Sequence, residues 1–168
     1  MKLIVYYIFS LVLLNKIKKK TMITFLTKEL ITPVIEQDAR DLFSLLSKRK
    51  QLPLSEVFNN EKEAPFIACY IENGRLLGMA SMAVYKVISG HKGWIEDVVV
   101  SESQRGKKIG KQLIQALIEK GKSLDLGEIL LFTSADKVGA IKLYEQEEFK
   151  DKGVLVYVKA LKEIYPKQ

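Results

Sequence analysis

Three apolar runs follow one another between residues 66 and 100, and the short turns between them constrain the fold more than any other feature. The first two runs are separated by Glu72-Asn73-Gly74, and an Asn-Gly pair between apolar runs is a strong signal for a tight hairpin. The stretch SGHKG then turns the chain into a third run, WIEDVVV, over residues 94–100. Strands joined by turns this short run in opposite directions, so the pattern predicts an antiparallel meander.

The segments before this meander predict a strand and two helices. The strand is expected over 22–29, and a short helix within 52–63. Between them, residues 32–50 show helical apolar spacing, with Thr32 in a capping position and Pro33 in the first turn.

After residue 100 the pattern changes to alternating helices and strands. A helix that begins after Gly106 and ends near Gly121 is followed by a strand over 128–134, a helix over 137–147 and a last strand over 153–161. A meander followed by such units predicts an α/β fold with a mixed, mostly antiparallel central sheet flanked by helices. Residues 22–168 are expected to form a single domain.

Residues 1–21 form a separate apolar and basic leader. Its apolar run, Leu3–Leu14, has 12 residues, fewer than the roughly 20 that span a bilayer as a helix. The leader is interpreted either as a weak membrane-surface anchor or as sequence upstream of a true start at Met22, and the second interpretation is favoured. Membrane contact is expected only if residues 1–20 belong to the protein.

The charge of the chain is concentrated in that leader. The formal net charge is +7, but residues 1–20 carry five lysines and no acidic residue, so the rest has 22 basic and 20 acidic residues. A nearly balanced body does not indicate nucleic-acid binding. The single cysteine, Cys69, excludes an intrachain disulfide and favours a reducing, cytoplasmic location. No Cys/His cluster indicates a metal site.

The stretch SQRGKKIGKQL, residues 103–113, joins the strand that ends at Val100 to a helix. The first N–H groups of a helix have no intrahelical acceptor, and the helix dipole adds partial positive charge there. Glycines let the backbone approach a ligand closely. The stretch therefore predicts a site for phosphate or pyrophosphate, although four cations at an exposed helix start are also typical of a solvated surface. The spacing matches neither the Walker loop nor the dinucleotide fingerprint.

Two motifs resemble the GNAT superfamily of acetyl-CoA-dependent N-acetyltransferases. Residues 94–118 are similar to its cofactor motif, Arg/Gln-x-x-Gly-x-Gly/Ala, and AIKLYEQEEF at 140–149 is similar to its later helix. Three residues depart from the usual pattern. Lys108 stands where a glycine is commonest, Glu148 replaces the glycine before Phe149, and Lys137 lies where many members have asparagine. The resemblance implies the GNAT-like acyl-CoA N-acyltransferase fold.

The resemblance also implies direct transfer of acetyl from acetyl-CoA to an amine. It assigns to CoA a strand and the loop that follows, namely Val98, Val99, Val100, Arg105, Gly106, Lys107, Lys108, Ile109, Gly110 and Lys111. Tyr144 matches the family tyrosine that protonates the departing thiolate. Glu96 is expected to be the base, because strand alternation puts it on the face opposite Asp97 and only one of the two can face a given cleft. Asp97 is expected to be structural or substrate-binding, and a base acting through water is the alternative.

The acceptor stays open at this point. The strand GWIEDVVV is similar to that of glucosamine-6-phosphate N-acetyltransferases, but small amines and protein amino groups are equally compatible with the motifs. No metal cofactor is expected, and a homodimer is possible. The second hypothesis is a non-catalytic CoA-binding or interaction module on the same fold.

Overall fold

The computed structural model describes residues 22–60 and 62–161, so the predictions for residues 1–21 lie outside the described part of the chain. Five strands form one sheet in the order β1-β2-β3-β4-β5, in which every neighbouring pair is antiparallel except β4 and β5. The strands are β1 (Met22–Phe25), β2 (Phe66–Glu72), β3 (Arg75–Val87), β4 (Gly90–Val100) and β5 (Glu128–Leu131). The predicted mixed, mostly antiparallel sheet is confirmed.

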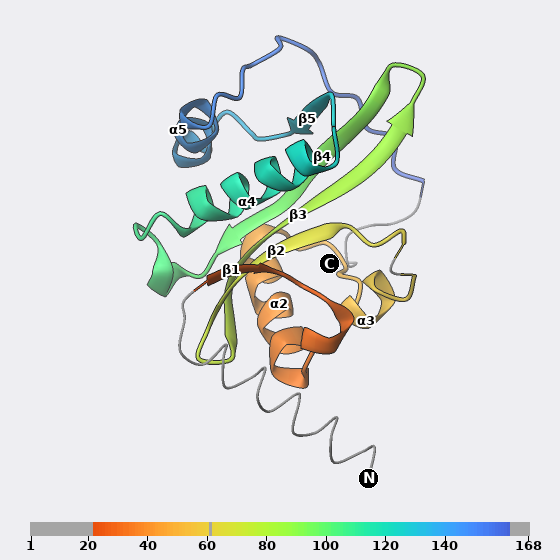
Figure 1. Ribbon diagram of the computed structural model, residues 1–168. Coiled ribbons are helices and arrows are strands. Elements are labelled where there is room, and N and C mark those ends of the chain that lie inside the picture. The colour runs from red at the N-terminus through yellow and green to blue at the C-terminus, as the bar shows by residue number, and fades with distance from the viewer. Residues whose placement is uncertain (1–21, 61, 162–168) are drawn as a thin grey trace.

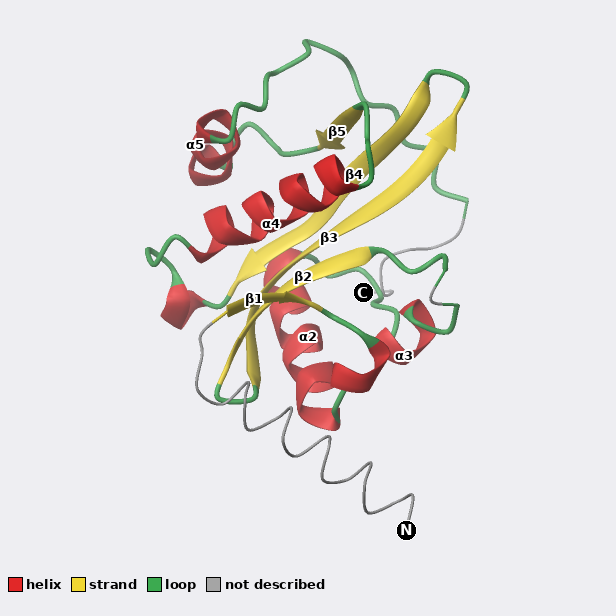
Figure 2. Cartoon of the chain, viewed as in Figure 1, coloured by secondary structure: helices red, strands yellow, loops and turns green. Residues whose placement is uncertain are grey.

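Helices cover both faces of this sheet (Figures 1 and 2). One face carries α2 and α3, and the other carries α4 and α5. The helical elements are η1 (Lys28–Leu30), α2 (Pro33–Leu46), α3 (Leu54–Val57), η2 (Glu102–Gln104), α4 (Ile109–Ser123) and α5 (Val138–Gln146). We call the two faces the α2 side and the α4 side.

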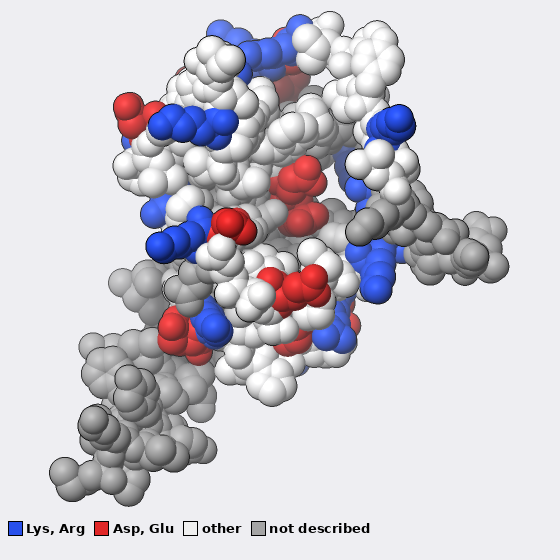
Figure 3. Space-filling model, turned by 90° about the vertical axis from the view of Figure 1, so that its right-hand side faces the viewer, with Lys and Arg blue, Asp and Glu red and all other residues white. Residues whose placement is uncertain are grey.

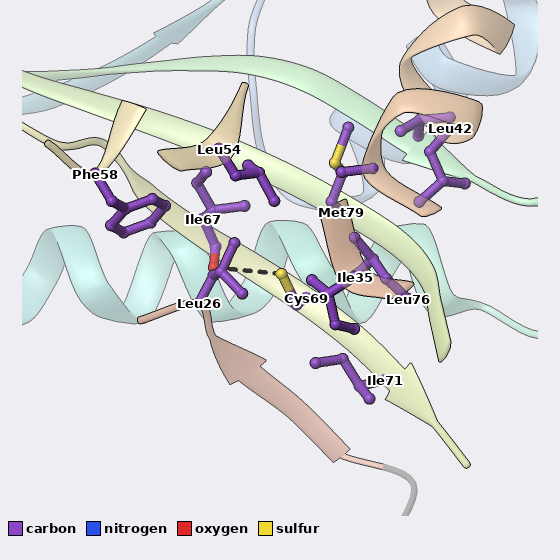
Figure 4. Packing of buried hydrophobic residues seen from close by; sticks show 12 residues of the cluster. Leu26, Ile35, Leu42, Leu54, Phe58, Ile67, Cys69, Ile71, Leu76 and Met79 are labelled. Carbon is purple, nitrogen blue, oxygen red and sulfur yellow. Dashed lines mark hydrogen bonds between the residues drawn. The ribbon is translucent and has the colours of Figure 1, made fainter. Parts of the chain in front are cut away.

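Side-chain alternation along β2 divides the core into two layers. Ile67, Cys69 and Ile71 are buried on the α2 side, whereas Ala68 and Tyr70 are buried on the α4 side. Figure 4 shows the α2-side layer, where side chains of β2 and β3 meet those of α2. Because both faces are covered, β2 reads as a continuous apolar run rather than an alternating one.

Helix α2 is fixed at its start and in its middle. The Thr32 hydroxyl accepts a hydrogen bond from the Ile35 N–H at 3.2 Å, which confirms the predicted cap. Farther along, Asp38 is 4% exposed and accepts hydrogen bonds from the Arg75 guanidinium at 2.6 Å and from the Leu76 N–H at 2.9 Å. This carboxylate holds α2 against the first two residues of β3.

The predicted hairpin between β2 and β3 is present. Glu72 pairs with Arg75, and the two residues between them, Asn73 and Gly74, have φ angles of 52° and 76°. Positive φ at both central positions is what the tightest hairpin turns require, and Asn and Gly adopt it at low cost. The Asn-Gly signal in the sequence was therefore sufficient for this turn.

The predicted last strand over residues 153–161 is wrong, because this segment belongs to neither a strand nor a helix. Val154, Leu155 and Tyr157 expose 69%, 80% and 87% of their surface. The Lys152 ammonium bonds to Glu128 at 2.7 Å, which ties the residue just before the segment to the first residue of β5. Strand propensity alone therefore did not place the segment in the sheet.

The strand predicted over 128–134 is present but shorter, because β5 ends at Leu131. Among the described residues, no helix is long and apolar enough to cross a bilayer.

Candidate active site

Strands β4 and β5 separate halfway along β4. Their parallel pairing ends at Ile95 and Leu131, whereas β4 continues to Val100. On the opposite edge, β4 stays paired with β3 as far as Val100. The edge of β4 that faces away from β3 therefore carries backbone groups without a strand partner in the described chain. An extended ligand with amide groups can pair with such an edge.

A bulge in β4 lies at the point of separation. Ser81 pairs with Glu96 and Met79 with Val99, so two residues of β4 oppose one residue of β3, and Asp97 has a φ angle of 54°. A bulge of this kind changes which face the following side chains meet.

The predicted alternation along β4 is wrong because of this bulge. Ile95 is buried on the α4 side but Val99 is buried on the α2 side, although simple alternation would put them on one face. Val98 and Val100 consequently turn to the α4 side. Alternation up to the bulge turns Glu96 to the α2 side, and Asp97 also lines a cavity on that side. The two carboxylates thus share a face.

Electrostatics supports this proximity. Partial burial raises the pKa of Glu96, the negative charge of Asp97 raises it further, and the Arg49 charge opposes both effects. Burial likewise raises the pKa of Asp97, against the Ser81 hydroxyl, which donates to its carboxylate at 3.4 Å, and the Arg49 charge. A carboxylate with a raised pKa beside a cavity is a candidate for proton transfer.

The predicted anion site has an open backbone. Gly106 has a φ angle of 79° and Lys108 one of 60°, and α4 begins at Ile109 without a side-chain cap. A Cβ built on Gly106 would meet nothing within 4 Å, so the loop surface there is open to a ligand. The uncapped N–H groups of the first turn fit a pyrophosphate.

Most of the cations in this loop have protein partners. Arg105 lies 3.2 Å from Glu102, Lys107 donates to Gln104 at 2.7 Å, and Lys111 lies 2.9 Å from Glu147. The contacts of Arg105 and Lys107 are at the surface, where an ion pair contributes little and exchanges readily, whereas the Glu147 side chain that meets Lys111 is only 9% exposed. The backbone amides are therefore the main feature of the site, and the cations are secondary.

A glycine that the sequence analysis overlooked positions the start of α4. A Cβ on Gly78 of β3 would lie 3.3 Å from Ile109 Cγ2 and 3.3 Å from the Val99 carbonyl oxygen. Gly78 therefore lets the first turn of α4 approach the sheet closely, next to the free edge of β4. An isolated glycine inside a strand pattern was the available signal.

Tyr144 lies on α5 and faces the α4 side. It is 8% exposed, packs edge-on to Phe149 with ring centroids 6.0 Å apart, and burial raises the pKa of its phenol. The preceding residue, Leu143, lies 3.4 Å from the position of a Cβ on Gly110, so α5 is held against the first turn of α4. Tyr144 thus belongs to the layer on the α4 side, whereas the two carboxylates at the bulge of β4 face the α2 side of the sheet.

A cavity of about 270 Å³ lies on the α2 side, between the helices α2 and α3 and the middle strands of the sheet. We call it the α2 cavity. Ser81 and Asp97 line it from the sheet, and Lys50 lines it from the segment between α2 and α3. Figure 3 shows acidic side chains gathered at a hollow in one face of the molecule. Sequence analysis named Asp97 as a possible substrate contact but missed Ser81 and Lys50, since no local motif marks either.

Comparisons with known proteins agree with this geometry. The chain is 30% identical over 95 residues to an L-methionine sulfoximine/L-methionine sulfone acetyltransferase of Pseudomonas aeruginosa, covering 56% of this chain and 55% of that protein. It is 37% identical over 65 residues to a glucosamine 6-phosphate N-acetyltransferase of Candida albicans, covering 39% and 42%. The match thus spans about half the length of each of these relatives.

The fold and the family follow from two further matches. A crystal structure of an acetyltransferase from Trypanosoma brucei superposes with a TM-score of 0.69 at 22% identity, covering 83% of this chain and 99% of the other. The family model described as "Acetyltransferase (GNAT) family" matches residues 32–149. The chain therefore belongs to the GNAT acetyltransferase family.

Proposed function

We propose that this protein is an N-acetyltransferase that transfers acetyl directly from acetyl-CoA to a primary amine. The observation that carries the proposal is the free edge of β4, which leads into the uncapped start of α4. Val98–Val100 would pair with the amides of the pantetheine arm, and the loop Arg105–Lys111 would hold the pyrophosphate.

Glu96 on the α2 side and Tyr144 on the α4 side suit the two proton transfers of this reaction. Glu96 would take a proton from the acceptor ammonium, directly or through water, because its raised pKa favours accepting a proton. The neutral amine nitrogen then forms a bond to the acetyl carbon, the carbon–sulfur bond breaks, and the nitrogen loses its second proton to solvent water. Tyr144 would give its phenol proton to the leaving thiolate.

The proposed function specifies the acceptor only as a primary amine. The relatives act on different amines according to their names, one on an amino-acid analogue and one on an amino-sugar phosphate. Similarity to these relatives therefore does not distinguish an amino acid from an amino sugar as the acceptor. A cytoplasmic location is proposed because the body is nearly balanced in charge and its one thiol, on Cys69, is free and buried.

A turnover assay with the purified protein tests the proposed function. Acetyl-CoA binding is measured by calorimetry, and free CoA is followed during incubation with a broad panel of amines. We expect binding together with release of CoA that depends on one class of amine. Tight binding without turnover of any amine would overturn the proposal and favour a non-catalytic CoA-binding module.

A further inference from the structure

The α2 cavity is small, which favours a small acceptor molecule. Its volume of about 270 Å³ is below the roughly 300–1,000 Å³ of most small-molecule sites. The cavity lies on the same side of β4 as Glu96 and directly over Asp97. A compact amine fills a volume of this size with its nitrogen beside Asp97, the chain neighbour of the proposed base, whereas a molecule of several sugar rings would extend beyond it into solvent.

Most of the cavity wall is apolar, which favours an acceptor whose side chain is aliphatic. The apolar side chains come from three elements and the segments beside them, and include Phe43, Leu52, Leu54, Val57, Ile67 and Met79. A polar group that is buried without a hydrogen-bond partner costs free energy. The hydroxyls of an amino sugar would meet this wall unpaired, whereas a small aliphatic group would be buried favourably.

The polar groups at the cavity carry charges of both signs. Asp97 supplies a carboxylate from the sheet; the Ser81 hydroxyl bonds to the Glu96 carbonyl oxygen at 3.0 Å and lies 3.4 Å from the Asp97 carboxylate. Lys50, an exposed residue of the segment between the helices, also lines the cavity, and the neighbouring Arg49 is near enough to affect both carboxylates of β4. A simple alkylamine would be attracted by the carboxylates but repelled by Lys50. A zwitterion complements both signs.

We propose that the acceptor is an α-amino acid with a small apolar side chain, bound in the α2 cavity. Its ammonium group faces Asp97 and Glu96, its side chain contacts the apolar wall, and its carboxylate faces Lys50. This inference rests on the proposed acetyl transfer. The ammonium gives one proton to Glu96, and the neutral nitrogen then bonds to the acetyl carbon as the carbon–sulfur bond breaks. The nitrogen loses its second proton to solvent water, and the leaving thiolate takes the phenol proton of Tyr144.

A set of related acceptors tests each part of this assignment. Initial rates of CoA release are measured for leucine, leucinamide, the peptide Leu-Gly-Gly, isopentylamine and glucosamine 6-phosphate. The Cys69 thiol is fully buried, so a thiol reagent reports on released CoA. We expect kcat/KM for leucine to exceed that for isopentylamine by about tenfold, because only leucine presents a carboxylate to Lys50.

A charge-removing variant tests the role of Lys50. We expect Lys50→Gln to raise KM for leucine about fivefold, the size of one solvent-exposed ion pair, with kcat and the KM for leucinamide little changed. Lys48→Gln is the matched control, because Lys48 is an exposed lysine on the same segment that does not line the cavity. It should leave the KM for leucine unchanged.

The outcomes separate this proposal from the function on which it rests. Preference for glucosamine 6-phosphate, isopentylamine or the peptide would overturn the amino-acid acceptor and leave acetyl transfer intact. Equal effects of Lys50→Gln on leucine and leucinamide would overturn the carboxylate contact. Absence of CoA release with every amine, despite acetyl-CoA binding, would overturn the transferase function itself.

Discussion

At the scale of single residues, burial and the bulge decide which groups can move protons. Tyr144 sits in an apolar layer that raises the pKa of its phenol, so the phenol stays protonated at neutral pH and has a proton to give when the CoA sulfur lies next to it. Glu96 has a raised pKa because of burial and a neighbouring carboxylate. The two groups are therefore suited to opposite tasks.

Tyr144→Phe should lower kcat with little effect on acetyl-CoA affinity. The substitution removes the proton donor but keeps the ring that packs on Phe149, so we expect kcat to fall roughly 100-fold while the melting temperature is preserved. Steady-state kinetics and calorimetry measure the two quantities separately. An unchanged kcat would show that another group protonates the thiolate.

The pH profile should identify the base. A base works when it is deprotonated, so kcat/KM rises with pH through the pKa of Glu96, which lies above that of an ordinary carboxyl group. Asp97→Asn removes a neighbouring negative charge that raises this pKa, so the rise should move to lower pH. Asn tolerates the positive φ at this position, which keeps the bulge.

Two carboxamide variants serve as controls for this profile. Glu96→Gln should abolish the rise, whereas Glu119→Gln, at an exposed position on α4, should leave it in place. A profile that is the same in wild type and Asp97→Asn would mean that Asp97 does not interact with the base.

At the scale of elements, the loop between β4 and α4 depends on one glycine conformation. Gly106 has a positive φ and open space around it, so Gly106→Ala strains the backbone without a steric clash. The left-handed region costs a non-glycine residue roughly 1–2 kcal/mol. We expect the loop to shift and acetyl-CoA affinity to fall about tenfold.

Gly153→Ala is a matched control for this prediction. Gly153 also has a positive φ and nothing within 4 Å, but it lies in the C-terminal segment away from the loop. Both variants should lose a similar amount of stability in urea denaturation, and only Gly106→Ala should lose affinity. Equal losses of affinity would show that the loop conformation has no specific role in binding.

The C-terminal segment shows how an element can fail to form despite a favourable sequence. Residues 153–161 have the apolar, β-branched composition of a strand. A strand gains stability only when it pairs with an edge, and this segment pairs with no strand of the described chain. The segment is left exposed, and its apolar side chains contribute little to the core.

At the scale of the whole molecule, stability should come from the two core layers and not from this segment. Val156 and Val158 are 51% and 78% exposed, so replacing both with lysine should leave the melting temperature almost unchanged. Leu113→Ala, at a fully buried position of α4, should cost about 2–5 kcal/mol. Thermal unfolding measures both.

Light scattering on the same double variant measures its mass in solution, and so tests whether the segment takes part in association between chains. If the wild type and the double lysine variant have the same mass and melting temperature, the segment is free in solution as in the structure. A drop in either quantity for the variant alone would show that the two valines are packed in solution.

The sequence by itself determined the features that depend on local spacing. The Asn73-Gly74 turn, the Thr32 cap and the glycine-containing start of α4 each involve residues a few positions apart, where backbone preferences act directly. The antiparallel order of β2, β3 and β4 followed from the short turns that join them. The mixed sheet and the candidate anion site could therefore be predicted.

Only the tertiary structure decided the features that depend on pairing between distant segments. The bulge at Asp97 comes from the register of β4 against β3, and it turned Glu96 and Asp97 to one face where simple alternation predicted two. The α2 cavity brings Lys50 to Asp97 through the packing of α2 and α3 on the sheet. Residues 153–161 stayed outside the sheet, because a strand also needs a pairing partner in space, which composition does not specify.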